Sequence, residues 1–392
     1  MASPNKNALI LSGGGARAAY QVGVLKALTE ILPATAHNPF PIICGTSAGA
    51  INALFIASHP GTLRESVSQL EQLWRSLSPD LVYKTAFGSM VKSFVRLGLS
   101  LFNEGVGAHR PLSLLDNGPL RQLLHDCIRF EGIDDSIANG DLEAVAVTST
   151  GYTSGHSVSF FQAKPGIAGW QRHNRIGSPT RLTLDHIMAS AAIPTIFPAV
   201  KLNREYFGDG ALRQTAPISP ALHLGANRLF VIGVSGNRNP EQWHRQKPVR
   251  HSPSMAQIMG HLFSSAFIDA IEGDIEHMQR INELLALIPD QERTRSQLHL
   301  RPVESMIISP SKAVDSIAGR KIRYLSPSLR FALRTVGATA KGGGATAASY
   351  LLFAPAFCGT MIDLGYKDTM WERGAIEQFF QLQACQRDDA YA

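Results

Sequence analysis

Residues 41–54 constrain the fold of this 392-residue chain more than any other stretch. A short apolar run at 42–44 leads into the pentapeptide G-T-S-A-G, and an apolar pattern with helical spacing follows. A G-x-S-x-G sequence between a strand and a helix is typical of a nucleophile elbow, a sharp turn that needs small neighbours and presents the serine at the carboxyl end of the sheet. We therefore predict Ser47 as a nucleophile, with Gly45 and Gly49 as the elbow glycines.

A second glycine-rich turn follows an earlier strand. The apolar residues 8–11 run into Gly13–Ala18, which reads G-G-G-A-R-A, and apolar positions recur at helical spacing over 19–32. Because both turns follow a strand and precede a helix, we expect them at the same edge of a parallel sheet, where open α/β folds carry their sites. The free amides and positive dipole end at the start of each helix favour a nearby anion.

The alternation of strands and helices predicts an α/β fold. Further apolar runs with strand character lie at 142–148, 158–162, 228–235 and 305–309. A helix is predicted at 62–77, and the alternation favours a mostly parallel central sheet with helices on both faces. We predict a catalytic domain over 6–235 and a mostly helical C-terminal extension over 236–392, with one strand at 304–309 that could pack on the same domain.

Composition places few limits on the partners of the chain. Hydrophobic residues make up 44% and charged residues 17%, as in an ordinary folded protein with a sizeable core. The formal net charge of +6 favours anionic partners, such as nucleic acid or an anionic membrane surface, without choosing between them. The four cysteines are far apart, which fits a reducing compartment. With no signal-peptide pattern and no apolar run long enough for a transmembrane helix, we expect a cytoplasmic protein.

Two stretches differ in character from the α/β pattern. Residues 84–103 place apolar side chains at helical spacing opposite a polar and basic face, which predicts an amphipathic helix. Such a helix serves either as a cap packed on the core or as a lid that faces a membrane, and the sequence leaves both open. Residues 236–254 form a polar, basic loop without periodicity, which is typical of solvated surface.

A serine nucleophile needs a base, and a third motif supplies a candidate. Phe207–Ala211 reads F-G-D-G-A, so Asp209 lies in a tight turn between two glycines. In most serine hydrolases a histidine takes the serine proton and a carboxylate orients the histidine, and in α/β-hydrolases the chain order is Ser, acid, His. Spacing leaves that order open here, because six histidines follow the aspartate: His223, His244, His251, His261, His277 and His299.

Competing interpretations of the same motifs are weaker. Gly13–Ala18 also fits the dinucleotide fingerprint G-x-G-x-x-A, but the second strand ends near Cys44 without the carboxylate that would contact a ribose. The acidic residues over 269–277 match no metal-ligand spacing, so we expect no metal. The basic residues over 312–341 suit anionic lipid better than nucleic acid, because few aromatic residues lie among them.

Together the three motifs resemble those of the patatin-like lipid acyl hydrolases. That family carries a glycine-rich loop with a basic residue after the first strand, then G-x-S-x-G, then D-G-[GA]. The matching segments here are Gly13–Ala18, Gly45–Gly49 and Asp209–Ala211. Residues 109–124, which contain L-L-D-N-G-P-L-R-Q-L-L, and residues 189–198, A-S-A-A-I-P-T-I-F-P, are also similar to the family. The resemblance covers roughly residues 6–235 and implies the three-layer fold of these enzymes.

The resemblance implies a catalytic dyad without histidine. Ser47 would be the nucleophile and Asp209 its base. A carboxylate takes a serine proton usefully only in a partly desolvated site, where its pKa rises toward neutrality. The oxyanion would rest on backbone amides of the glycine-rich loop, namely those of Gly13, Gly14, Gly15 and Ala16.

The other motif residues have supporting roles in this resemblance. Arg17 would hold the glycine-rich loop or contact a phosphate, and the sequence favours neither. Gly210 and Ala211 complete the D-G-A turn, in which alanine is a common variant. The chain departs from the family at Ala18, where glycine is frequent, but alanine is small enough for close packing of helix and strand.

The implied function is hydrolysis of carboxylic esters in phospholipids or lysophospholipids through an acyl-serine intermediate, without metal or organic cofactor. The substrate would be a lipid, and 84–103 together with the basic loops could hold the protein at an anionic membrane surface. Nucleic acid is not expected as a partner. Two alternatives stay open: an acyltransferase that uses the same acyl-serine, and a non-enzymatic lipid- or nucleotide-binding module. The sequence does not determine headgroup, acyl position, chain length or oligomeric state.

Overall fold

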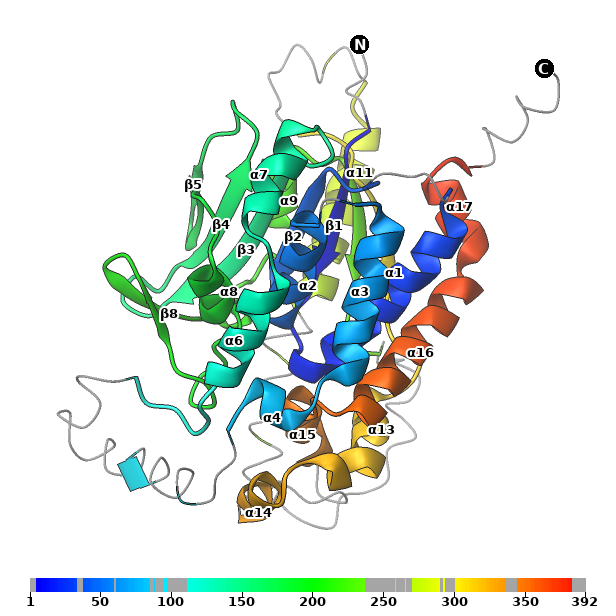
Figure 1. The fold of residues 1–392 in the computed structure, drawn as a ribbon. Coiled ribbons are helices and arrows are strands. Elements are labelled where there is room, and N and C mark those ends of the chain that lie inside the picture. The colour runs from blue at the N-terminus through cyan, green and yellow to red at the C-terminus, as the bar shows by residue number, and fades with distance from the viewer. Residues whose placement is uncertain are drawn as a thin grey trace.

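The computed structural model describes residues 5–33, 38–59, 61–84, 111–236, 270–289, 300–335 and 344–382, together with positions 88, 95, 96, 258, 265 and 292. Its strands are β1 (Asn7–Leu11), β2 (Ile42–Thr46), β3 (Ala144–Gly151), β4 (Ser157–Ala163), β5 (Trp170–Arg172), β6 (Arg175–Pro179), β7 (Val200–Leu202), β8 (Glu205–Asp209), β9 (Arg228–Ile232) and β10 (Glu304–Ile308). Figure 1 shows β1 and β2 in the middle of the molecule and β4, β5 and β8 toward one side.

The helices connect and cover the strands. The N-terminal and central ones are α1 (Ala19–Ile31), α2 (Ala48–Ala57), α3 (Leu63–Ser76), α4 (Pro79–Val82), α6 (Gly118–Cys127), α7 (Glu131–Ala138), α8 (Leu184–Ser190) and α9 (Ser219–His223). The C-terminal ones are α11 (Ala270–Ala286), α13 (Val314–Lys321), α14 (Pro327–Thr335), α15 (Gly344–Leu351), α16 (Pro355–Trp371) and α17 (Arg373–Phe379). Short 3-10 turns lie at η1 (Gly15–Ala18), η2 (Gly210–Leu212) and η5 (Ile322–Tyr324). In Figure 1, α1, α3 and α16 lie to the other side of β1 and β2.

The described strands form one mixed sheet in the order β10-β9-β1-β2-β3-β4-β6-β5, with β8 paired to both β3 and β7. Every pairing from β10 to β3 is parallel, whereas β3 pairs with β4 and β8 in the antiparallel sense. Ile10 of β1 lies beside Cys44 of β2, so both glycine-rich turns leave the sheet at its carboxyl edge. The predicted α/β class is confirmed, and the sheet is mixed because of the antiparallel hairpins beyond β3.

Alternating side chains of the central strands pack into two cores. On β1, Leu9 and Leu11 join the larger core, which contains α1, α2 and the helices from α13 to α17, whereas Ala8 and Ile10 join a smaller core with α9 and α11. All of α2 is buried, since it lies inside the larger core. The helix after the elbow is therefore packed on all sides, which fixes the direction of the turn before it.

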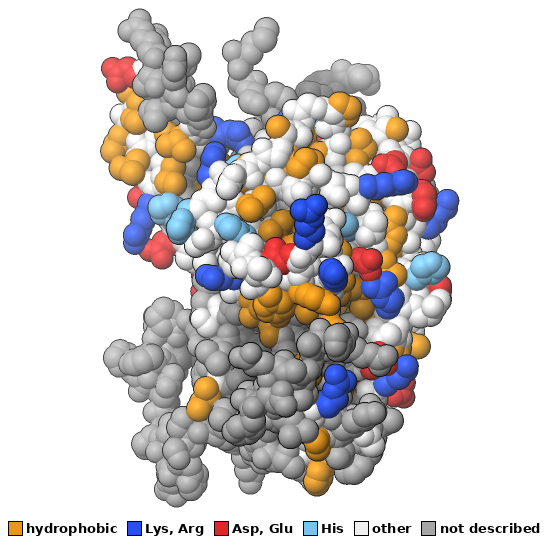
Figure 2. Space-filling model, turned by 90° about the vertical axis from the view of Figure 1, so that its left-hand side faces the viewer, with side chains coloured by type: hydrophobic (Ala, Val, Ile, Leu, Met, Phe, Trp, Pro, Cys, Tyr) orange, Lys and Arg blue, Asp and Glu red, His pale blue; other side chains and the backbone are white. Residues whose placement is uncertain are grey.

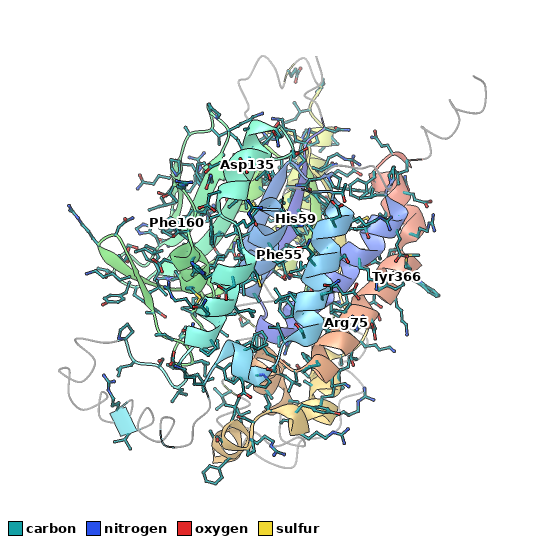
Figure 3. The ribbon with its side chains drawn as sticks, in the orientation of Figure 1. Phe55, His59, Arg75, Asp135, Phe160 and Tyr366 are labelled. Atoms are coloured by element: carbon teal, nitrogen blue, oxygen red, sulfur yellow. The ribbon has the colours of Figure 1, made fainter. Side chains whose placement is uncertain are left out.

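The described part of the predicted C-terminal extension shares the sheet and the larger core with the predicted catalytic domain. β10 is an edge strand paired with β9, and α16 packs along α1. Arg75 of α3 forms an ion pair of 2.7 Å with Asp363 of α16, and Tyr366 of α16 donates a hydrogen bond to Glu30 of α1; Arg75 and Tyr366 are labelled in Figure 3. The C-terminal helices are thus joined directly to the first α/β units.

Some sequence predictions fall outside what the structure describes. The amphipathic helix at 84–103 and the basic loop at 236–254 lie outside the described residues, apart from positions 84, 88, 95, 96 and 236. Within the described chain, no single helix combines the length and apolar character needed to cross a membrane, while one sharply bent pair, α15 with α16, meets that criterion by length and composition alone.

Candidate active site

Ser47 lies in the sharp turn between β2 and α2. Its backbone has φ 55° and ψ −128°, which L-residues rarely adopt, and it is the N-cap of α2. Its amide donates a 2.8 Å hydrogen bond to the Ser190 hydroxyl, which donates in turn to the Thr148 carbonyl. A Cβ at Gly49 would lie 2.2 Å from the Leu11 carbonyl oxygen, so this turn requires glycine there. Neighbouring elements therefore hold the strained backbone that presents the hydroxyl.

Asp209 reaches Ser47 from a different part of the sheet. It ends β8, which pairs antiparallel with the end of β3, and its amide donates a 2.9 Å hydrogen bond to the Ala192 carbonyl. A Cβ at the next residue, Gly210, would lie 2.1 Å from the Thr148 carbonyl oxygen. The glycine lets the turn press against β3, and this close approach brings the carboxylate to the elbow.

The two side chains form a buried hydrogen-bonded pair. The Ser47 hydroxyl donates a 2.6 Å hydrogen bond to Oδ2 of Asp209, and the Ala211 amide donates one of 3.0 Å to Oδ1. Ser47 is 1% exposed and Asp209 0%. Burial raises the pKa of the Asp209 carboxyl to about 7, while its two hydrogen bonds act in the opposite direction. A carboxyl with this pKa exchanges protons readily near neutral pH.

Among the described residues, no histidine hydrogen bonds to either member of this pair. His223 bonds to the Ser219 carbonyl and stacks on Trp170, away from the elbow. His277 lies on α11. The remaining histidines that follow Asp209 lie outside the described residues: His244, His251, His261 and His299. Over the described part of the chain, His, Cys, Asp and Glu side chains form no group of three that could hold a metal ion.

The glycine-rich loop reaches the same cavity as Ser47. Gly15 and Ser47 both line that cavity. Gly15 has φ 54°, and a Cβ there would lie 2.2 Å from the Tyr350 carbonyl oxygen of α15. Only glycine fits such a position, because it needs both the left-handed backbone and the close approach. The other residues of the predicted oxyanion loop are buried: Gly13, Gly14 and Ala16.

Arg17 turns away from solvent and into the protein. It is 2% exposed, and its guanidinium bonds to the Ser349 hydroxyl and to the Asp315 carboxylate, each at 2.7 Å. It also lies over the Tyr350 ring, 4.4 Å from the centroid. All of these partners belong to α13 and α15, far along the chain from the glycine-rich loop.

An apolar cavity opens at Ser47 between α2, α3 and α6. Its volume is about 30 Å³, which has room for only one or two water molecules. Its lining is almost wholly hydrophobic and includes Ile51, Trp74, Leu120, Leu124, Ile193 and Phe353. Apolar side chains therefore surround the space next to the Ser47 hydroxyl.

The sequence profile of the patatin-like phospholipase family matches residues 9–222. This chain belongs to that family. The matched residues include the glycine-rich loop, the elbow and the D-G-A turn, and therefore every segment on which the resemblance was based. The predicted family is confirmed.

Individual members of the patatin-like family match over part of their length. The chain is 29% identical over 221 residues to the cGAMP-activated phospholipase of Pseudomonas aeruginosa, and this match covers 56% of each protein. It is 25% identical over 217 residues to calcium-independent phospholipase A2-gamma of Mus musculus, which covers 55% of this chain and 25% of the mouse protein. The match thus spans about half of the bacterial relative and a quarter of the mouse one.

A solved structure of human GIVD cytosolic phospholipase A2 aligns with 96% of this chain and 60% of that chain, with a TM-score of 0.45 and 9% identity. At this level of similarity, the assignment to the patatin-like family rests on the sequence profile.

A larger cavity of about 500 Å³ lies beside the patatin-like site, at the carboxyl ends of β1, β9 and β10. Its lining includes Ser12, Val234, Glu272 and Ser309, but neither Ser47 nor Asp209. The larger of these two cavities therefore does not contain Ser47, whereas the smaller apolar cavity does.

Sequence reasoning missed several residues that support the site. Ser190 receives the Ser47 amide bond, and the Tyr152 hydroxyl lies close over Gly208, next to the carboxylate. Burial and the negative charge of Asp209 raise the pKa of Tyr152. Ser190 belongs to a segment already noted as similar to the family, so that similarity was a usable signal. Nothing local in the sequence marks Tyr152, because its position depends on the pairing of β3 with β8.

Proposed function

We propose that this protein is a lipid acyl hydrolase that uses Ser47 as nucleophile and Asp209 as base. The observation that carries the proposal is the buried 2.6 Å hydrogen bond between the two side chains, where Ser47 and Gly15 also line an apolar cavity. Nucleophile, base and backbone donors in one desolvated site are the components that ester hydrolysis through an acyl-enzyme requires.

In the first half of the proposed reaction, the Ser47 oxygen attacks the ester carbonyl carbon. Asp209 accepts the hydroxyl proton as the new C–O bond forms. The carbonyl oxygen becomes an oxyanion, and the amides of the Gly13–Ala16 loop and the N-terminus of α2 stabilise it. The tetrahedral species then collapses, the ester C–O bond to the alcohol breaks, and protonated Asp209 returns the proton to the leaving lysolipid or alcohol oxygen.

The second half regenerates the enzyme by hydrolysis. Water enters next to Asp209, which takes one proton while the hydroxide oxygen attacks the acyl-Ser47 carbonyl. The same backbone amides stabilise the second oxyanion. Collapse releases the fatty acid, and the proton on Asp209 returns to the Ser47 oxygen. One carboxyl thus serves as base and acid in turn, which its pKa of about 7 favours at neutral pH.

The apolar cavity suits the acyl chain of the substrate. Ser47 is part of its otherwise apolar lining, so an acyl chain for which the cavity widens would have its ester carbonyl near the hydroxyl. Membership of the patatin-like family, and relatives that are named phospholipases, support a phospholipid or lysophospholipid substrate. The contacts of Arg17 favour a role in holding the loop over a role in binding phosphate, because its guanidinium is buried on protein partners.

We further propose peripheral contact with an anionic membrane, supported by the net charge of +6. Figure 2 shows basic and acidic side chains interspersed among the described residues of one face, so that face offers no broad basic surface. The predicted amphipathic helix at 84–103 and the basic loops are the candidates for this contact. Co-sedimentation with anionic vesicles should weaken when Lys92 and Arg96 are both changed to Glu, and unchanged binding would remove this segment from the proposal.

Assays of Ser47→Ala and the wild type on a lipid panel test the main proposal. The wild type should release fatty acid from phosphatidylcholine or lysophosphatidylcholine micelles, and the Ser47→Ala variant should not, although its circular dichroism spectrum is unchanged. A fluorophosphonate probe should label the wild type at Ser47 only. A protein that neither labels nor hydrolyses any lipid would instead be a binding module. Transfer of the acyl group to an added lysolipid in preference to water would indicate an acyltransferase.

A further inference from the structure

The glycine-rich loop that is proposed to bind the oxyanion cannot fix its own shape. Three consecutive glycines lack the side chains that limit backbone rotation, and Gly15 has a left-handed φ of 54°. Catalysis by backbone amides needs donors placed within a fraction of an ångström before the reaction begins. Contacts from outside the loop must therefore supply the rigidity that the glycines remove.

Those contacts come from α13 and α15, which lie beyond residues 9–222 that match the family profile. The backbone of α15 presses directly on the loop, where the Tyr350 carbonyl occupies the space that a Cβ of Gly15 would need. Figure 1 shows α15 and α13 beneath the carboxyl edge of the sheet, close to the start of α1. The loop is thus sandwiched between the sheet and the C-terminal helices.

Arg17 connects the glycine-rich loop to both helices, because its guanidinium contacts side chains of α13 and of α15. Its Nε donates to Ser349 Oγ at 2.7 Å, and its Nη2 donates to Asp315 Oδ1 at 2.7 Å. The other Asp315 oxygen accepts a 2.7 Å bond from Thr346 Oγ1, so the carboxylate is itself held in place. The flat face of the guanidinium lies over the Tyr350 ring. Arginine geometry suits this multiple contact, and lysine would not reproduce it.

We propose that Asp315 and Ser349 are positioning residues for the reaction, which hold Arg17 and through it the oxyanion loop, so that α13 and α15 complete the active site. The inference rests on the proposed function, because it assumes that the loop stabilises the oxyanion. It assigns a catalytic contribution to C-terminal helices for which neither the motifs nor the family profile gives a role. Removal of either positioning side chain should slow acyl transfer to Ser47 while the substrate still enters the apolar cavity.

The molecule offers a matched control at the opposite edge of the sheet. Arg228, at the start of β9, is also buried, and it also lies over an aromatic ring of the C-terminal region, with 4.4 Å to the Phe379 centroid. It forms an ion pair of 2.7 Å with Glu304, whose side chain is 54% exposed. In the same way, the buried Arg17 guanidinium pairs with Asp315, whose side chain is 43% exposed. The two pairs match in burial and length, but Arg228 lies at the amino ends of the strands.

The experiment compares Asp315→Asn and Ser349→Ala with the control Glu304→Gln. We would measure kcat and KM on a medium-chain p-nitrophenyl ester, the rate and final extent of fluorophosphonate labelling, and Tm. A displaced donor loop lowers kcat, and the expected loss is about tenfold or more for Asp315→Asn, and less for Ser349→Ala, with KM changed less than about threefold. Labelling should slow by a similar factor yet reach the same extent. Glu304→Gln should lower Tm comparably and leave kcat and the labelling rate unchanged.

The outcomes separate this inference from the proposed function. If Asp315→Asn and Ser349→Ala lower kcat no more than Glu304→Gln does, the two residues contribute only stability and the inference is overturned. Should Asp315→Asn fold poorly, Ser349→Ala decides alone, because it removes one uncharged hydroxyl. If Ser47→Ala retains hydrolysis, the proposed dyad fails, whatever the C-terminal variants do.

Discussion

Ser47 and Asp209 stand on two regions of one sheet that the chain builds differently. On the parallel side, β2, Ser47 and α2 follow one another directly, so strand, nucleophile and helix form one local unit. On the antiparallel side, Asp209 ends a short strand that belongs to the β7–β8 hairpin and reaches the elbow only by pairing with β3. The geometry at Ser47, the proposed nucleophile, is therefore local, whereas the position of Asp209, its proposed base, depends on tertiary packing.

This difference predicts how substitutions should act in each half of the pair, near Ser47 and near Asp209. Changes near Ser47 should act through the backbone of the elbow, which α2 holds inside the larger core. Changes near Asp209 should act through distance, because the hairpin must lie close against β3 for the carboxylate to reach the hydroxyl. The predictions below test whether the two halves function as one unit despite this difference.

The largest effect is expected when either partner of the pair is removed. Ser47→Ala and Asp209→Asn should each lower kcat by roughly 10⁴-fold or more, because the hydroxyl is a poor nucleophile without its base. Since the two act as a unit, the double variant should lose little more than Ser47→Ala alone. Fatty-acid release under single-turnover conditions measures all three. Losses that multiply in the double variant would show that the halves act independently.

A smaller loss is expected when the close approach of the hairpin is blocked. Gly210→Ala would place a Cβ 2.1 Å from the Thr148 carbonyl oxygen and 2.9 Å from a methyl group of Thr46, so the turn must shift away from both strands. A displacement of about 1 Å at the carboxylate would cost on the order of 10²-fold in kcat. Gly273→Ala on α11 is the control, because nothing lies within 4 Å of its Cβ position, and it should leave kcat unchanged.

The pH dependence of kcat/KM should report the ionisation of Asp209. Only the ionised carboxylate can accept the serine proton, and burial raises the pKa of Asp209 to about 7. Activity should therefore reach a plateau above about pH 7 and fall by roughly tenfold for each unit below it. A profile that stays flat down to pH 5 would mean that another group serves as the base.

The raised pKa of Asp209 should also appear in the pH dependence of the free energy of unfolding, when the wild type is compared with Asp209→Asn. Because the folded-state pKa of about 7 lies above the ordinary value of 3.8, this carboxyl favours the fold while protonated, and that contribution is lost as pH rises through about 7. Asparagine stays neutral; its Oδ1 can accept from the Ala211 amide, and its Nδ2 can donate to the Ser47 oxygen, which reverses the direction of that hydrogen bond. The variant should thus exceed the wild type in free energy of unfolding at pH 8 by a few kcal/mol, on the order set by this shift. Urea denaturation at pH 5 and pH 8 measures whether the difference grows with pH.

The same contrast explains how far the sequence predicts this fold. The strand–turn–helix units at 8–32 and 41–58 were predicted close to the bounds of β1, α1, β2 and α2, because glycine signals and apolar periodicity are local. The short strands β5 to β8 were not predicted, since three to five residues give no clear alternation. The role of Asp209 as base was predicted from the family resemblance, because the strand that ends at Asp209 was not predicted.

Contacts that join distant segments lie beyond what a single sequence reveals. Arg17 and Ser349 are 332 positions apart, and no local pattern links them. The choice between a loop-holding arginine and a phosphate contact was therefore open from sequence. Ser190 lies 143 positions from the amide of Ser47 to which it bonds, and only the similarity of its segment to the family marked it.

The narrowness of the cavity at Ser47 has a consequence for how the protein would select among fatty acids. A cavity of about 30 Å³ is too small to hold an acyl chain, so its depth cannot set the chain length that the protein accepts. Each additional methylene would have to displace side chains of the lining, such as Trp74 of α3 and Leu124 of α6. Preference for long or short acyl chains would then follow from how easily these lining side chains move aside, and smaller residues in the lining should broaden that preference.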